Sequence, residues 1–457
     1  MLTIGGVAIL LAFIYWRPQE IFEDLPPQTL IAIALLACIA LILDKRVKAV
    51  RWRGSPLLVL LALFVGWSLF TVAVKAPGTL NAQFALFGIG TLTFVVTSQG
   101  LQNLRALTAV GVVFLCFSLA MAGLGVVQGF SPKTCFIKGA TASRDGIIHD
   151  IPDDRPCADM TDCRKGGVLG EEYICEHPGP LGTHSIQGRV RYRGILEDPN
   201  EMSWALNMGM PFAFAIYERK RTAFRFLVAV AMVILGGMCV VLTASRSGQL
   251  GLLATLGVYF FRRFRWAGGA LLGLLSVPVL IFGGRSGSEA EGSTDERLEA
   301  WSRALSLFRE YPFTGVGAGQ FREHHYLTAH NSFMLTLAEL GPLGFLLWTG
   351  LLYMAFKITI RVQRHLAGNA EGAVARAWAM ALLASLVGMV VSATFLSLSY
   401  HPLLWTVVGL VGALYGAVQS HDDAFVVKFG WRDLAALGAG DIAIVLGTLV
   451  YLRLKGF

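Results

Sequence analysis

The residues best suited to chemistry are arginines and a histidine that stand at the ends of long apolar runs. Arg246 lies in a short turn, T243-A-S-R-S-G248, directly after one such run. A guanidinium among hydroxyls can bind a diphosphate through two parallel hydrogen bonds. Alternatively, Arg246 is a structural residue that extends its charged group to the membrane surface. The pattern therefore leaves a phosphate site and a structural role open for Arg246.

A second arginine lies in a polar stretch that predicts a surface helix beginning near Ser293 or Thr294. At about 100° per residue, Arg297 projects beside Trp301, whereas Arg303 projects away from it. Arg297 thus lies on the face that this helix should bury. A buried guanidinium needs an anionic partner. That partner is a loop carboxylate if the role is structural, and a substrate if it is not.

His330 and Asn331 stand where this polar stretch enters the next apolar run, and Glu339 follows within the run. An ionisable group at that depth suggests function, although a histidine at a membrane boundary is often only an interfacial polar residue. Neutral imidazole is the commonest general base near neutral pH. We expect His330 to be the base, with His324 and His325 as alternatives, and Glu339 to need a partner.

A third polar segment, R191-Y-R-G-I-L-E-D-P-N200, precedes another apolar run. Asp198 and Asn200 flank Pro199, which is a strong signal for the start of a helix. Helix capping alone explains Asp198 and Asn200. It does not explain Arg191 and Arg193, which come just before them.

Long helices in a membrane must position these residues. Of the 457 residues, 55% are hydrophobic and 15% are charged, and the mean hydropathy is +0.60. The apolar residues form unbroken blocks, which are typical of membrane spans. We therefore predict an all-α, polytopic integral membrane protein of about 12–13 transmembrane helices. Candidate spans lie near residues 2–16, 28–43, 56–74, 84–98, 104–127, 201–217, 224–243, 248–261, 266–282, 333–355, 376–398, 402–418 and 433–451.

Basic clusters predict the orientation. They follow the second, sixth, eighth and tenth candidate spans, so all four lie on one side of the membrane, together with the N-terminus. The positive-inside rule makes that side the cytoplasm. The side of the C-terminus stays open. Because the net charge of +8 is explained by these clusters, we do not expect nucleic-acid binding.

Two long polar segments then lie on the outer face. The predicted organisation is residues 1–127 as N-terminal spans, 128–200 as a first outer loop, 201–282 as central spans, 283–331 as a helical catalytic loop, and 332–457 as C-terminal spans. Cys135, Cys157, Cys163 and Cys175 all lie in the first loop. Four cysteines facing an oxidising compartment predict two disulfides, in any of three pairings. Zinc is the alternative, but the spacing lacks a C-x-x-C pair.

Several motifs are absent from the sequence. It has no phosphate-binding G-x-x-x-x-G-K-[ST] loop and no D-x-D pair for a metal–nucleotide complex. The run G315-V-G-A-G319 has no strand–helix context. We expect no nucleotide cofactor and no metal.

Together these segments resemble the O-antigen ligase and polymerase superfamily. The matching motifs, in order, are G194-I-L-E-D-P-N200, S245-R-S-G248, R297-x-x-x-W-x-x-A-L305, the run P-F-T-G-V-G-A-G-Q-F from Pro312 to Phe321, and A329-H-N followed by A338-E-L-G-P-L-G344. They cover roughly residues 190–350. The cysteine-bearing loop resembles a local insertion.

The resemblance implies a membrane glycosyltransferase of the bacterial inner membrane with a periplasmic active site. The implied donor is a glycan on undecaprenyl diphosphate, and the acceptor is a lipid A core sugar or a second lipid-linked glycan. Inversion without a metal is also implied. Arg246, Arg297 and Arg193 would hold the diphosphate, and His330 would accept the proton. We expect Asp198, Asn200, Asn331 and Glu339 to support the site.

Ligases and polymerases of lipopolysaccharide or exopolysaccharide share these motifs, so the sequence does not separate them. A transporter or flippase for lipid-linked glycans is an alternative of another class. It should carry charged residues through both halves of the membrane, whereas the early spans here are nearly free of charge. A purely structural membrane protein leaves the ordered motifs unexplained.

Overall fold

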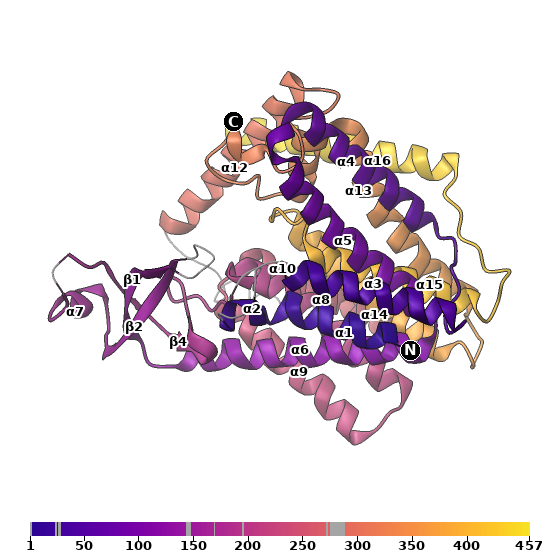
Figure 1. The fold of residues 1–457 in the computed structure, drawn as a ribbon, viewed down its shortest axis with the longest axis horizontal. Helices are drawn as coiled ribbons and strands as arrows, with labels where there is room; N and C mark the ends of the chain where they lie inside the picture. The colour runs from indigo at the N-terminus through magenta and orange to yellow at the C-terminus, as the bar shows by residue number, and fades with distance from the viewer. Residues whose placement is uncertain are drawn as a thin grey trace.

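Long helices form a bundle, and a small β-rich module extends from one end of it (Figure 1). The computed structural model describes residues 2–22, 25, 29–142, 148–168, 170–193, 196–270, 273–274 and 288–457. The main helices are α1 (Leu2–Tyr15), α3 (Thr29–Arg46), α4 (Pro56–Lys75), α5 (Leu80–Gly100), α6 (Leu104–Phe130), α8 (Pro199–Arg219), α9 (Ala223–Leu242), α10 (Arg246–Phe264), α12 (Ser288–Glu310), α13 (Ser332–His365), α14 (Ala373–Ala393), α15 (Pro402–Gln419) and α16 (Trp431–Lys455).

The predicted fold class is confirmed. Within the described residues, eight helices are long and apolar enough to cross a membrane: α4, α5, α6, α9, α13, α14, α15 and α16. Each predicted span coincides with a helix except 266–282, most of which lies outside the described residues. Helix α1 is shorter, and α3, α8 and α10 are more polar, so their crossing stays a prediction.

Four fully buried tryptophans tie the helices together. Each indole N–H has an acceptor on another segment or on the turn before its helix, as a buried indole requires. The partners are the Met389 carbonyl for Trp204 (3.3 Å), the Ser399 carbonyl for Trp348 (3.2 Å), the Thr108 hydroxyl for Trp378 (3.1 Å) and the Tyr400 carbonyl for Trp405 (3.3 Å).

Helix α16 runs antiparallel to α13 and fixes the side on which the described chain ends. Near the start of α16, Asp433 accepts a hydrogen bond of 2.6 Å from Lys357 in the second half of α13. Near the end of α16, the ring of Tyr451 lies 6.3 Å from that of Trp301 on α12. Helix α12 belongs to the second long loop. The end of α16 therefore lies on the same side as that loop, and Figure 1 places N and C at different ends of the molecule.

The first long loop contains an antiparallel sheet, which the sequence analysis did not anticipate. Its strands are β1 (Thr134–Ala142), β2 (Ile148–Pro156) and β3 (Tyr173–Glu176), in the order β2-β1-β3. Helix α7 (Met160–Arg164) precedes β3, and the short strands β4 (Pro178–Gly179) and β5 (Thr183–His184) follow it. This β-module adds strands to a fold that is otherwise helical.

Two disulfides cross-link the β-module, as predicted. Cys135 pairs with Cys163 and Cys157 pairs with Cys175, with Cα–Cα distances of 5.5 and 6.0 Å. This selects one of the three possible pairings. All four sulfurs are consumed, so the alternative of a zinc site made by these cysteines is wrong.

Candidate active site

A polar cavity of about 820 Å³ opens at the end of the bundle that carries the β-module. Its walls are the segment 186–191, the start of α8 with the residues just before it, the first half of α12 and the segment before α13. It brings together Asp198, Asn200, Arg297 and His330, which come from three segments far apart in the sequence. Four of the predicted site residues therefore share one cavity. Arg246, Arg193, Asn331 and Glu339 are not among the residues that line it.

His330 is held in an unusual backbone conformation, with φ of +46°. Its neighbour Asn331 caps α13, because its side-chain oxygen accepts hydrogen bonds from the amides of Phe333 (2.9 Å) and Met334 (3.1 Å). The next residue, Ser332, donates to the Leu396 carbonyl at 2.6 Å. The cap and this contact fix the backbone on the C-terminal side of His330.

The surroundings of His330 keep its imidazole neutral. Burial and then the positive charge of Arg297 lower its pKa from 6.5 to about 4, while Asp198 acts in the opposite direction. Arg297 is half-buried on the face of α12 that turns toward the cavity. At neutral pH the imidazole can therefore accept a proton, as a general base must.

Helix α12 begins earlier than predicted. It starts at Ser288, so Ser293 and Thr294 lie inside the helix and do not cap it. The exposed residue Glu296 lines the cavity together with Arg297. On the other side of the helix, Arg303 donates to Glu310 at 2.8 Å. Both arginines are half-buried, so the predicted contrast in burial between Arg297 and Arg303 is wrong. They differ in surroundings, since Arg297 lines the cavity and Arg303 is in an ion pair.

Like Gln187 and Glu201, Arg189 is a polar residue of the cavity wall that was not predicted from the sequence. Its guanidinium donates to the Thr243 carbonyl at 2.8 Å and to the Asn200 side chain at 3.1 Å. It thereby joins the turn before α10 to the start of α8. A signal was present, since arginines alternate with the buried residues Val190 and Tyr192 in R189-V-R-Y-R193, as in an extended segment.

The S245-R-S-G248 motif is largely explained by helix packing. The Ser245 hydroxyl caps α10 by accepting from the Gly248 amide at 3.0 Å. A Cβ on Gly248 would lie 2.0 Å from the Ser203 hydroxyl on α8, so only glycine fits there. Arg246 is the first residue of α10 and is exposed. Ser247 is buried, and its hydroxyl lies 3.1 Å from that of Ser245. Arg246 is thus the exposed residue of the motif.

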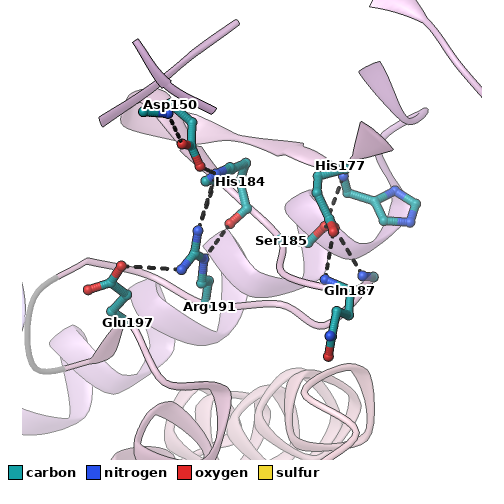
Figure 2. A network of polar contacts seen from close by, with 10 residues as sticks. Asp150, His177, His184, Ser185, Gln187, Arg191 and Glu197 are labelled. Carbon is teal, nitrogen blue, oxygen red and sulfur yellow. Dashed lines mark hydrogen bonds and ion pairs between the residues drawn. The ribbon is translucent and has the colours of Figure 1, made fainter. Parts of the chain in front are cut away.

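Arg191 connects the cavity to the β-module (Figure 2). Its guanidinium lies 3.2 Å from the Glu197 carboxylate and donates to the His184 carbonyl at 3.1 Å. Burial and then the charge of Arg191 lower the pKa of His184 to about 4. His184 is thus neutral at pH 7, and its 2.8 Å contact with Asp150 on β2 is a hydrogen bond and not an ion pair.

Arg193 turns toward the β-module. Its guanidinium donates to the Leu181 carbonyl in the turn between β4 and β5. Asp198, in contrast, both lines the cavity and caps α8, where it accepts from the Asn200 amide at 2.8 Å. Arg193 therefore contacts the turn just before β5, the strand whose His184 accepts from Arg191, and it does not line the cavity.

Glu339 holds the glycine-rich loop against α13. Its carboxylate accepts from the Phe321 amide at 3.0 Å and from the Tyr400 hydroxyl at 2.7 Å. Helix α13 is broken at Gly341, which frees carbonyls for other donors. The Val316 amide donates to the Ala338 carbonyl at 3.0 Å. Glu339 thus holds the loop in place and is not among the residues that line the cavity. Its supporting role in catalysis stays a prediction.

The alternative bases lie outside the cavity. His324 is exposed, and its carbonyl accepts from Arg303 at 3.3 Å. The side chain of His325 is 6% exposed and lies 3.9 Å from Glu299. Neither is among the residues that line the cavity. His330 is the one of these three histidines that does.

The fold and the cavity define a class: a multi-pass helical membrane protein with a polar cavity at one end of its bundle. Residues 230–349 match the family model described as O-antigen ligase. The resemblance to the O-antigen ligase and polymerase superfamily is therefore confirmed over a stretch from α9 into α13, and this family implies a glycosyltransferase-type enzyme that acts on lipid-linked glycans. The match covers four of the five motifs and leaves out G194–N200. No curated protein matches the chain.

Proposed function

We propose that the protein transfers a glycan from undecaprenyl diphosphate to an acceptor hydroxyl at the periplasmic face of the inner membrane, as an O-antigen ligase does. The observation that carries the proposal is the meeting of Arg297 and His330 in one polar cavity. Helices α8 and α13 begin at this cavity, and Arg219 and Arg364 lie in their last turns. The positive-inside rule assigns those last turns to the cytoplasm, and hence the cavity to the opposite face.

In the proposed reaction the acceptor oxygen attacks the anomeric carbon while the bond to the diphosphate breaks. The electron pair of that bond leaves with the diphosphate, and the acceptor proton passes to His330. Negative charge grows on the leaving group, and cations placed in advance in a site of low dielectric stabilise it. We assign this role to Arg297 and to Arg246 at the exposed start of α10. A single displacement of this kind inverts the anomeric carbon and needs no metal.

The carboxylates of the cavity have separate roles. Glu197 neutralises Arg191, Asp198 caps α8, and Glu201 lies 3.8 Å from His401. Their remaining oxygens, with those of Glu296, can accept hydrogen bonds from sugar hydroxyls. The mixed charge of the wall thus suits a donor with an anionic diphosphate and a neutral, hydroxyl-rich glycan.

Replacement of His330 tests the proposal. We expect His330→Ala to lower the rate of glycan transfer about 10²–10⁴-fold, the usual contribution of a general base, without loss of the folded protein. His324→Ala is the matched control, because His324 is close in sequence but does not line the cavity. Release of undecaprenyl diphosphate by purified protein in detergent is the measurement. Full activity of His330→Ala would exclude it as the base, and a flippase would release no diphosphate at all.

Polymerase activity is the second candidate within the same superfamily. A deletion strain separates the two. Single repeat units attached to the lipid A core indicate a lost polymerase, whereas free lipid-linked polymer beside bare core indicates a lost ligase.

A further inference from the structure

A second cavity, of about 540 Å³, lies at the end of the bundle opposite the candidate active site. One wall is the last part of α13, and the other is the segment 424–428 that leads from α15 to α16. Lys357, Arg361, Arg364 and His365 follow one another on one face of α13, and Lys428 faces them from the segment. We call this the basic cavity.

The basic cavity is preformed by contacts between its two walls. The Lys357 ammonium donates to the Lys428 carbonyl at 2.8 Å. The Phe425 ring lies 4.9 Å from that of His365, and the Phe425 carbonyl accepts from Gln419 at 3.2 Å. Both ends of the segment are therefore fixed, so a ligand would meet a site that needs no ordering.

The cavity has an excess of positive charge. Four permanently charged cations line it, and none of the lining residues is a carboxylate. The nearest acids pair with two residues of the cavity itself, Asp422 with His365 at 2.8 Å and Asp433 with Lys357 at 2.6 Å. The excess positive charge is therefore that of Arg361, Arg364 and Lys428. In the part of the chain that the structure describes, the exposed guanidiniums of Arg361 and Arg364 have no ion pair or hydrogen bond, so both are available to a ligand.

The surroundings place the basic cavity at the level of lipid headgroups. Val426 in its wall is 53% exposed, and Trp431 at the start of α16 is 75% exposed. The Arg432 guanidinium lies over the Trp431 ring at 5.5 Å. Exposed tryptophan with neighbouring cations is typical of the boundary between membrane and water. A ligand here would meet cations and apolar surface together.

Orientation alone does not require such a cavity. The turn between α8 and α9 carries Arg219, Lys220 and Arg221 on the same face of the membrane, all exposed, and they line none of the cavities described here. Basic pockets between helices on the cytoplasmic side bind anionic lipid headgroups. We propose that the basic cavity binds the phosphodiester headgroup of an anionic phospholipid, with Arg361 and Arg364 on the phosphate.

The test measures lipid binding by the full-length protein in nanodiscs of phosphatidylcholine, with phosphatidylglycerol added in steps and bound lipid counted by native mass spectrometry. The double variant Arg361→Gln/Arg364→Gln removes two charges from the cavity. Each basic residue near the surface contributes about 1 kcal/mol to the binding of anionic lipid, and the loss of two such residues corresponds to a factor of about thirty. We therefore expect about thirtyfold weaker binding of phosphatidylglycerol. The matched control, Arg219→Gln/Arg221→Gln, removes two charges from the same face and should keep binding within about threefold.

Equal losses in the two double variants would overturn the proposal, because they would show a general charge effect. A further arm adds inorganic phosphate to the protein in neutral detergent. If millimolar phosphate displaces the bound phosphatidylglycerol completely, the site takes soluble anions and the lipid assignment is wrong. The proposal does not depend on glycan transfer, so neither outcome bears on the first cavity.

Discussion

The proposed base, His330, is positioned by its neighbours in the sequence. A positive φ is uncommon outside glycine, although histidine adopts it more readily than most residues, and such conformations persist where the surroundings impose them. Here the Asn331 cap and the hydrogen bond of Ser332 to Leu396 do so. The imidazole is thereby held in the cavity, where burial and then the charge of Arg297 lower its pKa and keep it neutral.

The low pKa of His330, to which burial and then Arg297 contribute, predicts how activity depends on pH. With a pKa of about 4, His330 stays in its neutral, proton-accepting form down to about pH 5, whereas an ordinary histidine with a pKa of about 6.5 would be half protonated at pH 6.5. Arg297→Gln removes a charge that lowers the pKa, so the pKa rises and the acidic limb of kcat/KM moves to higher pH. The profile of kcat/KM between pH 4 and 8 is the measurement.

Arg303→Gln is the control for this shift. Arg303 lies on the other side of the same helix and pairs with Glu310, so its loss should leave the acidic limb in place. An acidic limb at the same pH in Arg297→Gln and in the parent protein would contradict the assignment of either the base or its neighbour.

At the scale of single residues, the sequence predicted those whose local motif carries the signal. His330 and Asn331 could be singled out because they stand at the start of an apolar run, and Arg297 because it lies beside Trp301 on a predicted helix. The alternation in R189-V-R-Y-R193 indicates an extended segment, but it could not predict the contacts of Arg189, because their partners come from other segments: Thr243 is 54 residues away. No local pattern reports such a contact.

Among the elements, the packing of α10 on α8 positions the turn that carries Arg246. Gly248 lets the two helices approach closely, as small residues do in membrane bundles. A Cβ on Gly248 would lie 2.0 Å from the hydroxyl of Ser203 and 2.4 Å from its Cβ. Asn207 also donates to the Gly248 carbonyl at 2.7 Å. The helices cannot separate without loss of this bond.

We therefore expect Gly248→Ala to destabilise the protein by about 1–3 kcal/mol, as overpacking in a core does. The second change Ser203→Gly removes both clashing atoms and should restore part of the loss. Gly237→Ala on α9 is the control, because no atom lies within 4 Å of its Cβ, and alanine favours a helix. Thermal unfolding in detergent measures all three. Equal melting temperatures for Gly248→Ala and Gly237→Ala would show that α8 and α10 are not in close contact.

The helices were predictable because long apolar runs report directly on membrane spans, and the sheet was not. Strands facing water on one side normally alternate buried and exposed residues. In β1, however, Cys135 and Phe136 are both buried in succession, because the disulfide with Cys163 and the packing of Phe136 against His184 at 4.8 Å bury opposite faces. The disulfide and the ring contact thus bury both faces of β1, so its sequence lacks the alternation by which a strand is recognised.

At the scale of the whole molecule, the two ends of the bundle have opposite chemistry. One end has the mixed polar cavity and the β-module, and the other has the basic cavity. Positive charge on one side orients a membrane protein as it inserts. The proposed headgroup site uses the same positive charge. The cavity that contains Arg297 and His330 lies on the opposite side of the membrane.

The direction of α16 gives the strictest test of this orientation. Arg453 and Lys455 in its last turn favour the cytoplasm on their own. Its antiparallel packing on α13, with Asp433 bound to Lys357, instead carries them to the side of the first cavity. Two basic residues have less influence on orientation than the four basic clusters on the other side. We therefore expect the end of α16 to lie outside the cytoplasm, as its packing on α13 requires. Alkaline phosphatase, active only outside the cytoplasm, should be active when fused after Phe457 and inactive when inserted at Gly368 between α13 and α14. The reverse pattern would show that the protein has the opposite orientation, with the first cavity facing the cytoplasm and the basic cavity facing the periplasm, which contradicts both assignments.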